Sequence, residues 1–265
     1  MNQSLEVLVA TMNCKSCEKL YKKMNLKTDA IIINQTDKIY YEEKIISENK
    51  VKCYSFNEKG IGLSRNSALM RSKADICVMA DDDMVYVDNY NEIILNGYKK
   101  HPDADMLVFN VRIHENGNTR HTVKENKRVH WYNSLRYGTV TFTFKRENIL
   151  KKNIFFSLLF GGGAKYGSGE DSLFITEVLT KKKKIYSVTD IIADVYNEGS
   201  TWFKGYNEKF FKDKGALFYS ISNRFAKIYC LQFLVRHRRK LTIEISFREA
   251  FQHMLNGIKE LKGEK

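Results

Sequence analysis

Apolar residues in the first part of the chain come in short continuous runs. Such runs predict strands that are buried on both faces of a sheet. The run at 76–80 is the clearest, and strands are also predicted at 5–10, 30–34 and 51–56. Stretches that read as helices separate them, at 16–24, 40–47 and 64–71. This alternation predicts an α/β fold, a mostly parallel sheet flanked by helices.

The middle of the chain continues the pattern. Asp88 is placed to cap a helix whose apolar residues, from Tyr90 to Tyr98, recur at helical spacing. Further strands are predicted at 106–113, 137–144 and 185–195, and the second of these alternates as a half-exposed strand does. Between the last two, a glycine-rich loop leads into a helix that opens with Glu170 and Asp171.

The pattern becomes helical beyond Gly199. Leu217, Ile221, Phe225 and Ile228 recur on one predicted helix face, and a capping box begins at Ser246. We therefore divide the chain into a sheet domain, 1–204, and a basic helical C-terminal extension, 205–265.

Positive charge is concentrated in this extension. The whole chain carries a formal charge of +13, and the residues from Gly199 onward hold 14 Lys and Arg against 6 Asp and Glu. This excess suggests an anionic partner: a nucleic acid, an acidic membrane surface or a phosphorylated substrate. The apolar stripe of the extension favours packing against the sheet domain or a second subunit, whereas 236–240 (Arg-His-Arg-Arg-Lys) favours an anionic membrane surface.

The cysteines and the apolar runs bear on the compartment. Five cysteines, an odd number, indicate a reduced cytoplasmic protein rather than a disulfide scaffold. Cys14 and Cys17 have redox or zinc spacing, but no second pair matches them, so packing or a helix start is the simpler interpretation. We expect no signal peptide and no membrane span, because the apolar runs are too short.

Three consecutive carboxylates, Asp81, Asp82 and Asp83, follow the fourth predicted strand directly. Adjacent acids repel one another unless a cation lies between them, and hard oxygen ligands suit Mg²⁺ or Mn²⁺. The end of a buried parallel strand is also where an open α/β sheet binds its ligand. The sequence therefore predicts a metal site here, with an acidic turn as the alternative.

Polar residues also follow the other predicted strands, where parallel topology brings loops to one edge. Thr11 and Asn13 follow the first strand, Asn34 and Gln35 the second, and Arg65 lies in a Gly-rich helix start. These groups suit a nucleotide, although an ordinary helix N-cap also explains the glycines. Glu170 and Asp171 suit a general base, or simply a helix start favoured by the dipole.

Taken together, these motifs resemble glycosyltransferase family 2, which has the nucleotide-sugar GT-A (Rossmann-like) fold. The likeness covers about the first three-quarters of the chain, judged by motif order. It is carried by Thr11 and Asn13, by Leu-Ser-Arg-Asn-Ser-Ala at 63–68, by Met-Ala-Asp-Asp-Asp at 79–83 and by Gly-Glu-Asp-Ser-Leu-Phe at 169–174. The segment 200–209 looks like a bacterial surface-polysaccharide branch of that family.

The resemblance implies roles for individual residues. It implies that Asp81 and Asp83 form the metal-binding DXD pair, and that Asp82 faces the ribose or sugar. It makes Asp171 the catalytic base and Glu170 the group that holds the acceptor or sugar. For the base and ribose it implies Thr11, Asn13, Asn34 and Gln35, with Arg65 close to the nucleotide. The family often has an acid in place of Asn34-Gln35, and relatives carry a His where this chain has Asn197.

The implied activity is that of an inverting hexosyl- or N-acetylhexosaminyltransferase. It would use a nucleotide-sugar donor, with UDP expected, and Mn²⁺ or Mg²⁺. The acceptor would be a hydroxyl of a growing or lipid-linked glycan in polysaccharide or capsule biosynthesis. The enzyme would be cytoplasmic or peripheral at the inner membrane face, and a homo-oligomer is compatible with this. The rival interpretations are a metal-dependent nucleotidyltransferase and a basic nucleic-acid-binding protein.

Overall fold

The computed structural model describes residues 3–196, 205–241 and 245–263. Its strands are β1 (Leu5–Met12), β2 (Asp29–Gln35), β3 (Tyr40–Ile46), β4 (Asn49–Phe56), β5 (Ile76–Asp81), β6 (Met84–Tyr86), β7 (Met106–Glu115), β8 (Asn118–His121), β9 (Lys127–Val129), β10 (Phe142–Lys145) and β11 (Ile185–Tyr196). Its α-helices are α1 (Cys17–Lys23), α2 (Ile61–Arg71), α3 (Tyr90–Lys100), α4 (Arg146–Leu150), α5 (Glu170–Thr180), α6 (Glu208–Ile221), α7 (Ala226–Leu241) and α8 (Phe247–Lys262).

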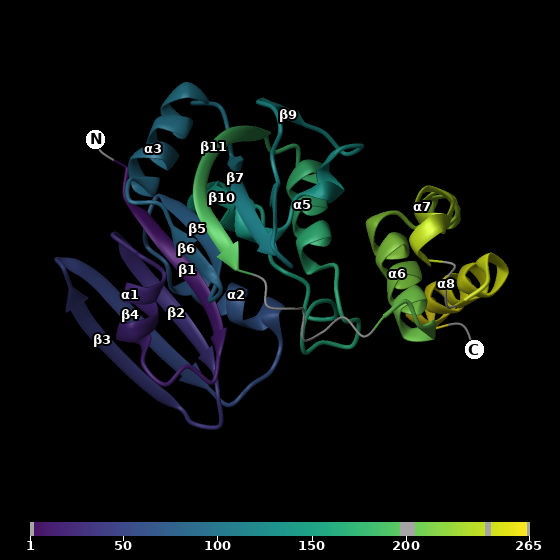
Figure 1. Cartoon of the computed structure of the whole chain (residues 1–265), viewed down its shortest axis with the longest axis horizontal. Coiled ribbons are helices and arrows are strands. Elements are labelled where there is room, and N and C mark those ends of the chain that lie inside the picture. The colour runs from purple at the N-terminus through teal and green to yellow at the C-terminus, as the bar shows by residue number, and fades with distance from the viewer. Residues whose placement is uncertain (1–2, 197–204, 242–244, 264–265) are drawn as a thin grey trace.

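Within the described residues, the strands form one sheet of eleven strands (Figure 1). The order is β3-β4-β2-β1-β5-β10-β7-β11-β6, with β8 paired to β7 and β9 to β11. β1 is parallel to β2 and β5, β2 is parallel to β4, and β7 is parallel to β11. β10 is antiparallel to both β5 and β7, so β7 runs in the same direction as β5. The carboxyl ends of all these parallel strands therefore lie at one edge of the sheet.

Helices cover both faces of the sheet, as the apolar runs predict. Val7 and Val9 of β1 belong to one hydrophobic cluster with residues of α1 and α3. Leu8, between them, belongs to a second cluster with residues of α2 and α5. Alternate side chains of a strand point to opposite faces, so the two clusters are the two layers of the core. This confirms the α/β class with a mostly parallel sheet.

Two predicted elements are wrong. The stretch 40–47, predicted as a helix, is the strand β3, which pairs antiparallel with β4 at the edge of the sheet. The stretch 137–144, predicted as a half-exposed strand, holds one 3₁₀ turn, Thr139–Thr141, and is a strand only from Phe142 onward, where the short strand β10 begins. Thr143 is buried rather than exposed, because β10 lies between two other strands, and Thr141, in the 3₁₀ turn before it, is buried as well.

The cap predicted for the helix after the acids is also wrong. α3 begins after Asn89, and no side chain caps its first turn by a hydrogen bond. Asp88 instead forms an ion pair with Lys27, 2.5 Å from its Nζ.

The C-terminal helices α6, α7 and α8 have a hydrophobic cluster of their own, and Figure 1 shows them grouped beside α5. The capping box at Ser246 is confirmed at the start of α8. A single helix face through Leu217 and Ile228 is wrong, because α6 ends at Ile221 and α7 begins at Ala226. Leu217 is buried, whereas Ile228 is 61% exposed. The domain division at residue 204 stays a prediction.

The expectation of five reduced cysteines is wrong for one pair. The structure joins Cys17, at the start of α1, to Cys53 in β4 by a disulfide. The two residues are 36 positions apart, and α1 packs back on the sheet and brings them together. Cys14, Cys77 and Cys230 are free. None of the helices in the described part of the chain is both long and apolar enough to cross a membrane.

Candidate functional site

The register of the central strands places three of the predicted site residues side by side. Thr11 of β1 is paired with Asn34 of β2, and Ala10 of β1 is paired with Asp81 at the end of β5. All of them lie at the carboxyl edge of the sheet. α2 and α5, which pack on one face of the same sheet, bring Arg65 and Glu170 to this edge.

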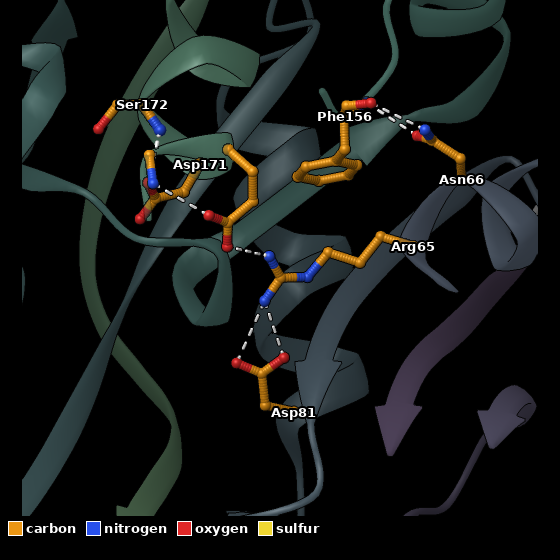
Figure 2. A network of polar contacts seen from close by, with 8 residues as sticks. Arg65, Asn66, Asp81, Phe156, Asp171 and Ser172 are labelled. Atoms are coloured by element: carbon orange, nitrogen blue, oxygen red, sulfur yellow. Dashed lines mark hydrogen bonds and ion pairs between the residues drawn. The ribbon is translucent and has the colours of Figure 1, made fainter. Parts of the chain in front are cut away.

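Arg65 joins the two acidic motifs. Its Nη1 donates to Glu170 Oε1 at 2.7 Å, and its Nη2 donates to Asp81 Oδ1 at 2.9 Å and Oδ2 at 3.3 Å (Figure 2). The Arg65 side chain is only 4% exposed. Although burial works to lower it, the pKa of Arg65 is raised by the carboxylates of Asp81 and Glu170. The structure therefore brings together two motifs that lie 89 residues apart in the chain (170 minus 81).

The Arg65 guanidinium lies over an aromatic floor, 5.5 Å from the centroid of the Phe156 ring. Phe156 in turn stacks on Phe174 of α5, with ring centroids 4.1 Å apart. Asn66, the next residue of α2, fixes the backbone of Phe156 through two hydrogen bonds of 2.8 Å (Figure 2). Arg65 is thus oriented by the Phe156 ring as well as by its two ion pairs.

Asp171 lies half-buried in the first turn of α5, beside this network. Its Oδ1 accepts a hydrogen bond from the backbone N–H of Ser172 at 2.6 Å (Figure 2). Burial and the neighbouring Glu170 carboxylate raise the pKa of Asp171 to about 6, while Arg65 and Lys214 oppose the rise. A carboxylate with this pKa is largely ionised at neutral pH and is a stronger base than an ordinary aspartate.

The three consecutive aspartates have three different environments. Asp81 is held by Arg65, and Asp82 accepts a hydrogen bond from the Thr11 hydroxyl at 2.5 Å. Asp83 differs, because its buried Oδ1 has no hydrogen-bond partner among the described residues. Burial and the charges of Asp81 and Asp82 raise the pKa of Asp83 to about 6. A buried carboxylate oxygen without a partner is costly unless something binds it.

Asp83 fits a divalent cation better than Asp81 does. Its free oxygen is the hard ligand that Mg²⁺ or Mn²⁺ prefers. Asp81, by contrast, already has both oxygens on Arg65. Among the described residues, the carboxylate oxygens of Asp81, Asp82 and Asp83 are not gathered as a ligand trio. The metal-ligand role of Asp81 and Asp83 stays a prediction.

The residues predicted to line the base and ribose are tied to the protein itself. Asn34 exchanges two hydrogen bonds with the backbone of Cys14, and its amide also donates to Ser55. Gln35 accepts a hydrogen bond from the backbone N–H of Gly60. Asn13 has a left-handed backbone, with φ of 52°, and its N–H donates to the Gln35 carbonyl. These contacts shape the rim of the site, and nucleotide binding by Thr11, Asn13, Asn34 and Gln35 stays a prediction.

Sequence reasoning missed how the glycine-rich loop is held. The loop carbonyl of Gly162 accepts a hydrogen bond from the N–H of Ile61, at the start of α2. A Cβ on Gly161 would lie 2.5 Å from Ile61 and 2.9 Å from the Glu170 carboxyl group, and a Cβ on Gly62 would lie 2.2 Å from the Ser157 carbonyl. The loop is therefore docked on α2. The sequence indicated this contact only through the glycines at positions 60, 62 and 161, which leave room for a close approach.

Lys214 of α6 is a second functional candidate that the sequence did not reveal. Burial lowers the pKa of Lys214, and the charges of Asp171, Glu170 and Asp213 raise it. The helical extension thus contributes a positive charge that acts on the two acids of α5, while the Lys214 Nζ itself lies over the Phe210 ring, 5.6 Å from its centroid. The predicted features at Asn197 and over 200–204, the first half of 200–209, lie outside the described residues.

Comparisons with known proteins place the fold. No protein-family model matches the chain, and no curated protein matches it. The crystal structure of residues 1–349 of S. aureus TarS in complex with UDP-GlcNAc aligns with a TM-score of 0.69 at 15% identity, over 97% of this chain and 80% of that chain. The same TarS fragment in complex with UDP aligns with a TM-score of 0.64 at 15% identity, over 97% and 81%.

A structure of the longer TarS chain aligns with a TM-score of 0.67 at 14% identity, over 97% of this chain but 48% of that one. The chain therefore spans about half the length of that protein. The likeness shows that the chain has a glycosyltransferase fold, that of TarS. At this identity it shows the fold alone.

Proposed function

We propose that this protein is an inverting glycosyltransferase that moves a sugar from a nucleotide-sugar to a hydroxyl group. The observation that carries the proposal is the Arg65 bridge, which gathers Asp81 and Glu170 at the carboxyl edge of the sheet with Asp171 beside them. This edge is where open α/β sheets bind ligands. The arrangement provides acids for a cation and a base for a hydroxyl within one site.

Asp171 is the proposed general base. In an inverting transfer the acceptor oxygen forms a bond to the anomeric carbon as the bond to the nucleoside diphosphate breaks, and the acceptor hydroxyl loses its proton. Because burial and Glu170 raise the pKa of Asp171 to about 6, it accepts that proton more readily than an ordinary aspartate. A transition state of oxocarbenium character needs no covalent enzyme intermediate.

Glu170 is proposed as a positioning residue. Its Oε1 accepts from Arg65 and its Oε2 accepts from the N–H of Gly169 at 3.1 Å, so the protein engages both of its oxygens. It is therefore better placed to orient Arg65 and Asp171 than to hold a sugar by itself. Its predicted contact with the acceptor or sugar would require one of these bonds to open.

The structure contains residues that suit a divalent cation. We propose that Asp83, through its unpartnered Oδ1, would hold Mn²⁺ or Mg²⁺, with Asp81 as the second acid of the motif. When bound, the cation would neutralise charge on the departing diphosphate. Thr11 holds Asp82 in place next to this position.

The finer aspects of the reaction rest on the likeness to TarS and on the motifs. Because a TarS structure contains UDP-GlcNAc, we propose a UDP-sugar donor and an N-acetylhexosaminyl or hexosyl group. We propose membership of glycosyltransferase family 2 on the motif order around Arg65, Asp81 and Asp171. The proposed acceptor is a hydroxyl of a glycan or lipid-linked glycan in bacterial surface polysaccharide synthesis.

The direct test is to incubate the full chain with UDP-GlcNAc and MnCl₂ and to identify the nucleotide product by anion-exchange chromatography. Transfer of the sugar to water or to an added acceptor should release UDP. A nucleotidyltransferase would instead consume or produce pyrophosphate. Calorimetry with UDP-GlcNAc, with and without Mn²⁺, measures donor binding separately. The proposal would be overturned if the protein bound neither UDP-GlcNAc nor any other nucleotide-sugar of a panel.

A further inference from the structure

The apolar residues of helix α7 divide into two faces. Ala226, Cys230 and Leu234 are buried and pack in the hydrophobic cluster of the C-terminal helices. Large apolar side chains on another side are exposed: Ile228 by 61%, Leu231 by 47% and Val235 by 57%, together with Phe225, which directly precedes the helix, by 44%. Their spacing of three, three and four residues places them along one side of the helix. We call these four residues the α7 stripe.

The packing of α7 against the other C-terminal helices does not explain the α7 stripe. In surface helices, apolar residues normally form one face toward the core, and the opposite face is polar. α7 has an apolar face toward the core and another toward solvent, with partly buried Tyr229 and Phe233 on the core side. Exposed apolar residues scattered singly need no explanation, but four in a row along one helix indicate a binding surface.

Basic residues surround the α7 stripe. At 100° per residue, Lys227 and Arg236 lie on its two flanks, and Arg224 and Arg239 lie at its two ends. All four side chains are exposed. The chain has no Asp or Glu anywhere from Lys214 to Ile243. The surface is therefore apolar in the middle and positively charged around it.

We propose that the α7 stripe and its basic rim dock on an anionic lipid bilayer surface. An amphipathic helix in the interface places its apolar residues at the boundary of headgroups and acyl chains and its Lys and Arg against anionic headgroups. A second copy of this chain, seated on the same face by two-fold symmetry, would bring like charges together. A nucleic acid would match the rim but would leave the stripe exposed. Of these three occupants, the lipid surface alone matches both the apolar stripe and the basic rim.

This inference extends the sequence-based prediction of an anionic membrane surface and changes where the contact lies. The prediction rested on 236–240 alone. It assigned the stripe predicted from the sequence, which runs from Leu217 to Ile228, to packing. The structure shows that Arg236 and Arg239 are exposed at the C-terminal end of the stripe, so charge and apolar surface act together. The inference concerns α7 and does not depend on the proposed reaction.

Flotation of the full chain with vesicles tests the proposal. The probes are vesicles of phosphatidylcholine alone and of an equimolar mixture of phosphatidylcholine and phosphatidylglycerol. The protein should float with the mixed vesicles at low salt and should not float with neutral ones. Salt should weaken the interaction, because screening reduces the attraction of the rim.

Two variants and their matched controls separate the stripe from the rim. The stripe variant, Ile228→Ser with Leu231→Ser and Val235→Ser, should lose at least tenfold in partitioning to mixed vesicles. The rim variant, Lys227→Gln with Arg236→Gln and Arg239→Gln, should lose as much. Two double variants serve as controls and should float as the original protein does. The first is Ile39→Ser with Ile45→Ser, at exposed apolar positions in and next to β3, and the second is Lys99→Gln with Lys100→Gln, on α3.

Three outcomes would overturn the proposal. The first is a protein that does not float with mixed vesicles. The second is a stripe variant that floats undiminished. The third is a protein that does not float but forms a concentration-dependent dimer in sedimentation, provided that the stripe variant abolishes this dimer. A second copy of the chain would then be the occupant of the stripe. Because the substituted side chains are exposed, thermal unfolding should show that all four variants remain folded.

Discussion

The carboxyl edge of the sheet and the outer face of α7 use charge in opposite ways. At the sheet edge, Arg65 is buried between Asp81 and Glu170, so each charge has a partner at a fixed distance. On α7, charges of one sign are exposed around an apolar stripe, with no acid nearby in the sequence. Paired buried charges fix geometry, whereas unpaired surface charges attract a partner from solution. The same chain thus builds a site at one place and a surface at another.

The largest effect should come from Asp171→Asn at the sheet edge. Loss of the general base should lower kcat by about 10²–10⁴-fold, whereas the Kd for UDP-GlcNAc from calorimetry should stay within about twofold. Asp190→Asn, at an exposed position of β11, is the control and should keep full activity. Near-normal turnover of Asp171→Asn would remove this residue from the role of base.

The stability of the same variant gives an independent check. The pKa of Asp171 in the folded protein, about 6, is above its ordinary value, so the folded state disfavours the ionised form. Ionised Asp171 therefore destabilises the protein above that pH. Asp171→Asn should unfold at the same or a higher urea concentration at neutral pH. A clear loss of stability would mean that its inactivity reflects misfolding.

Arg65→Met should break the pairing that distinguishes the sheet edge. It would leave Glu170 and Asp81 without their cation, and removing one partner of a buried ion pair costs about 3–5 kcal/mol. Urea unfolding should show this loss in the free energy of unfolding. Arg136→Met, at an exposed position, should change it by no more than about 0.5 kcal/mol. An Arg65→Met protein as stable as the original would show that the network does not hold the fold.

Two identical substitutions on α7 sharpen the contrast between its faces. Leu234→Ala removes a fully buried side chain and should cost about 2–5 kcal/mol. Leu231→Ala removes one that is 47% exposed and should cost well below half of that. Both can be measured by urea unfolding of the full chain. Equal losses would mean that the outer face is packed in solution, which would contradict a free docking surface.

The smallest effect should appear where the two regions meet, at Lys214. Its charge lowers the pKa of Asp171, so Lys214→Gln should raise that pKa. Since the base must be ionised, the acidic limb of kcat/KM against pH, expected near pH 6, should move to higher pH. The loss at pH 6 should remain below tenfold. Lys212→Gln on the same helix should leave the limb where it is, and a limb unmoved by Lys214→Gln would place this lysine outside the site.

Much of the sheet was predictable because buried parallel strands have continuous apolar runs. β1, β2 and β5 have such runs, whereas β4 alternates between buried and half-buried residues from Val51 onward, and each of the four was predicted at its observed place. β3 was not, because its residues are mostly exposed and carry Glu and Lys between two tyrosines and two isoleucines. The turn after it has positive φ at Ser47 and Glu48 rather than the glycine that signals a hairpin.

The site was predictable as a set of motifs but not as a set of bonds. Parallel topology alone places Asp81 and Asn34 at one edge. It does not say that Asn34 binds the backbone of Cys14, or that Arg65 bonds to Glu170, 105 residues away. Such contacts depend on how α2 and α5 pack, and local sequence carries no signal for them. Lys214 was missed for the same reason, because it reaches the site from a separate group of helices.

The contact between Gly161 and the start of α2 has a consequence for engineering this protein. A Cβ on Gly161 would lie 2.5 Å from the Ile61 side chain, and a Cβ on Gly62 would lie 2.2 Å from the Ser157 carbonyl, so neither segment can be exchanged alone. A graft that brings a new loop in place of 157–169 must bring a matching segment for 60–62 as well. The two stretches must be exchanged together, although almost a hundred residues separate them in the chain.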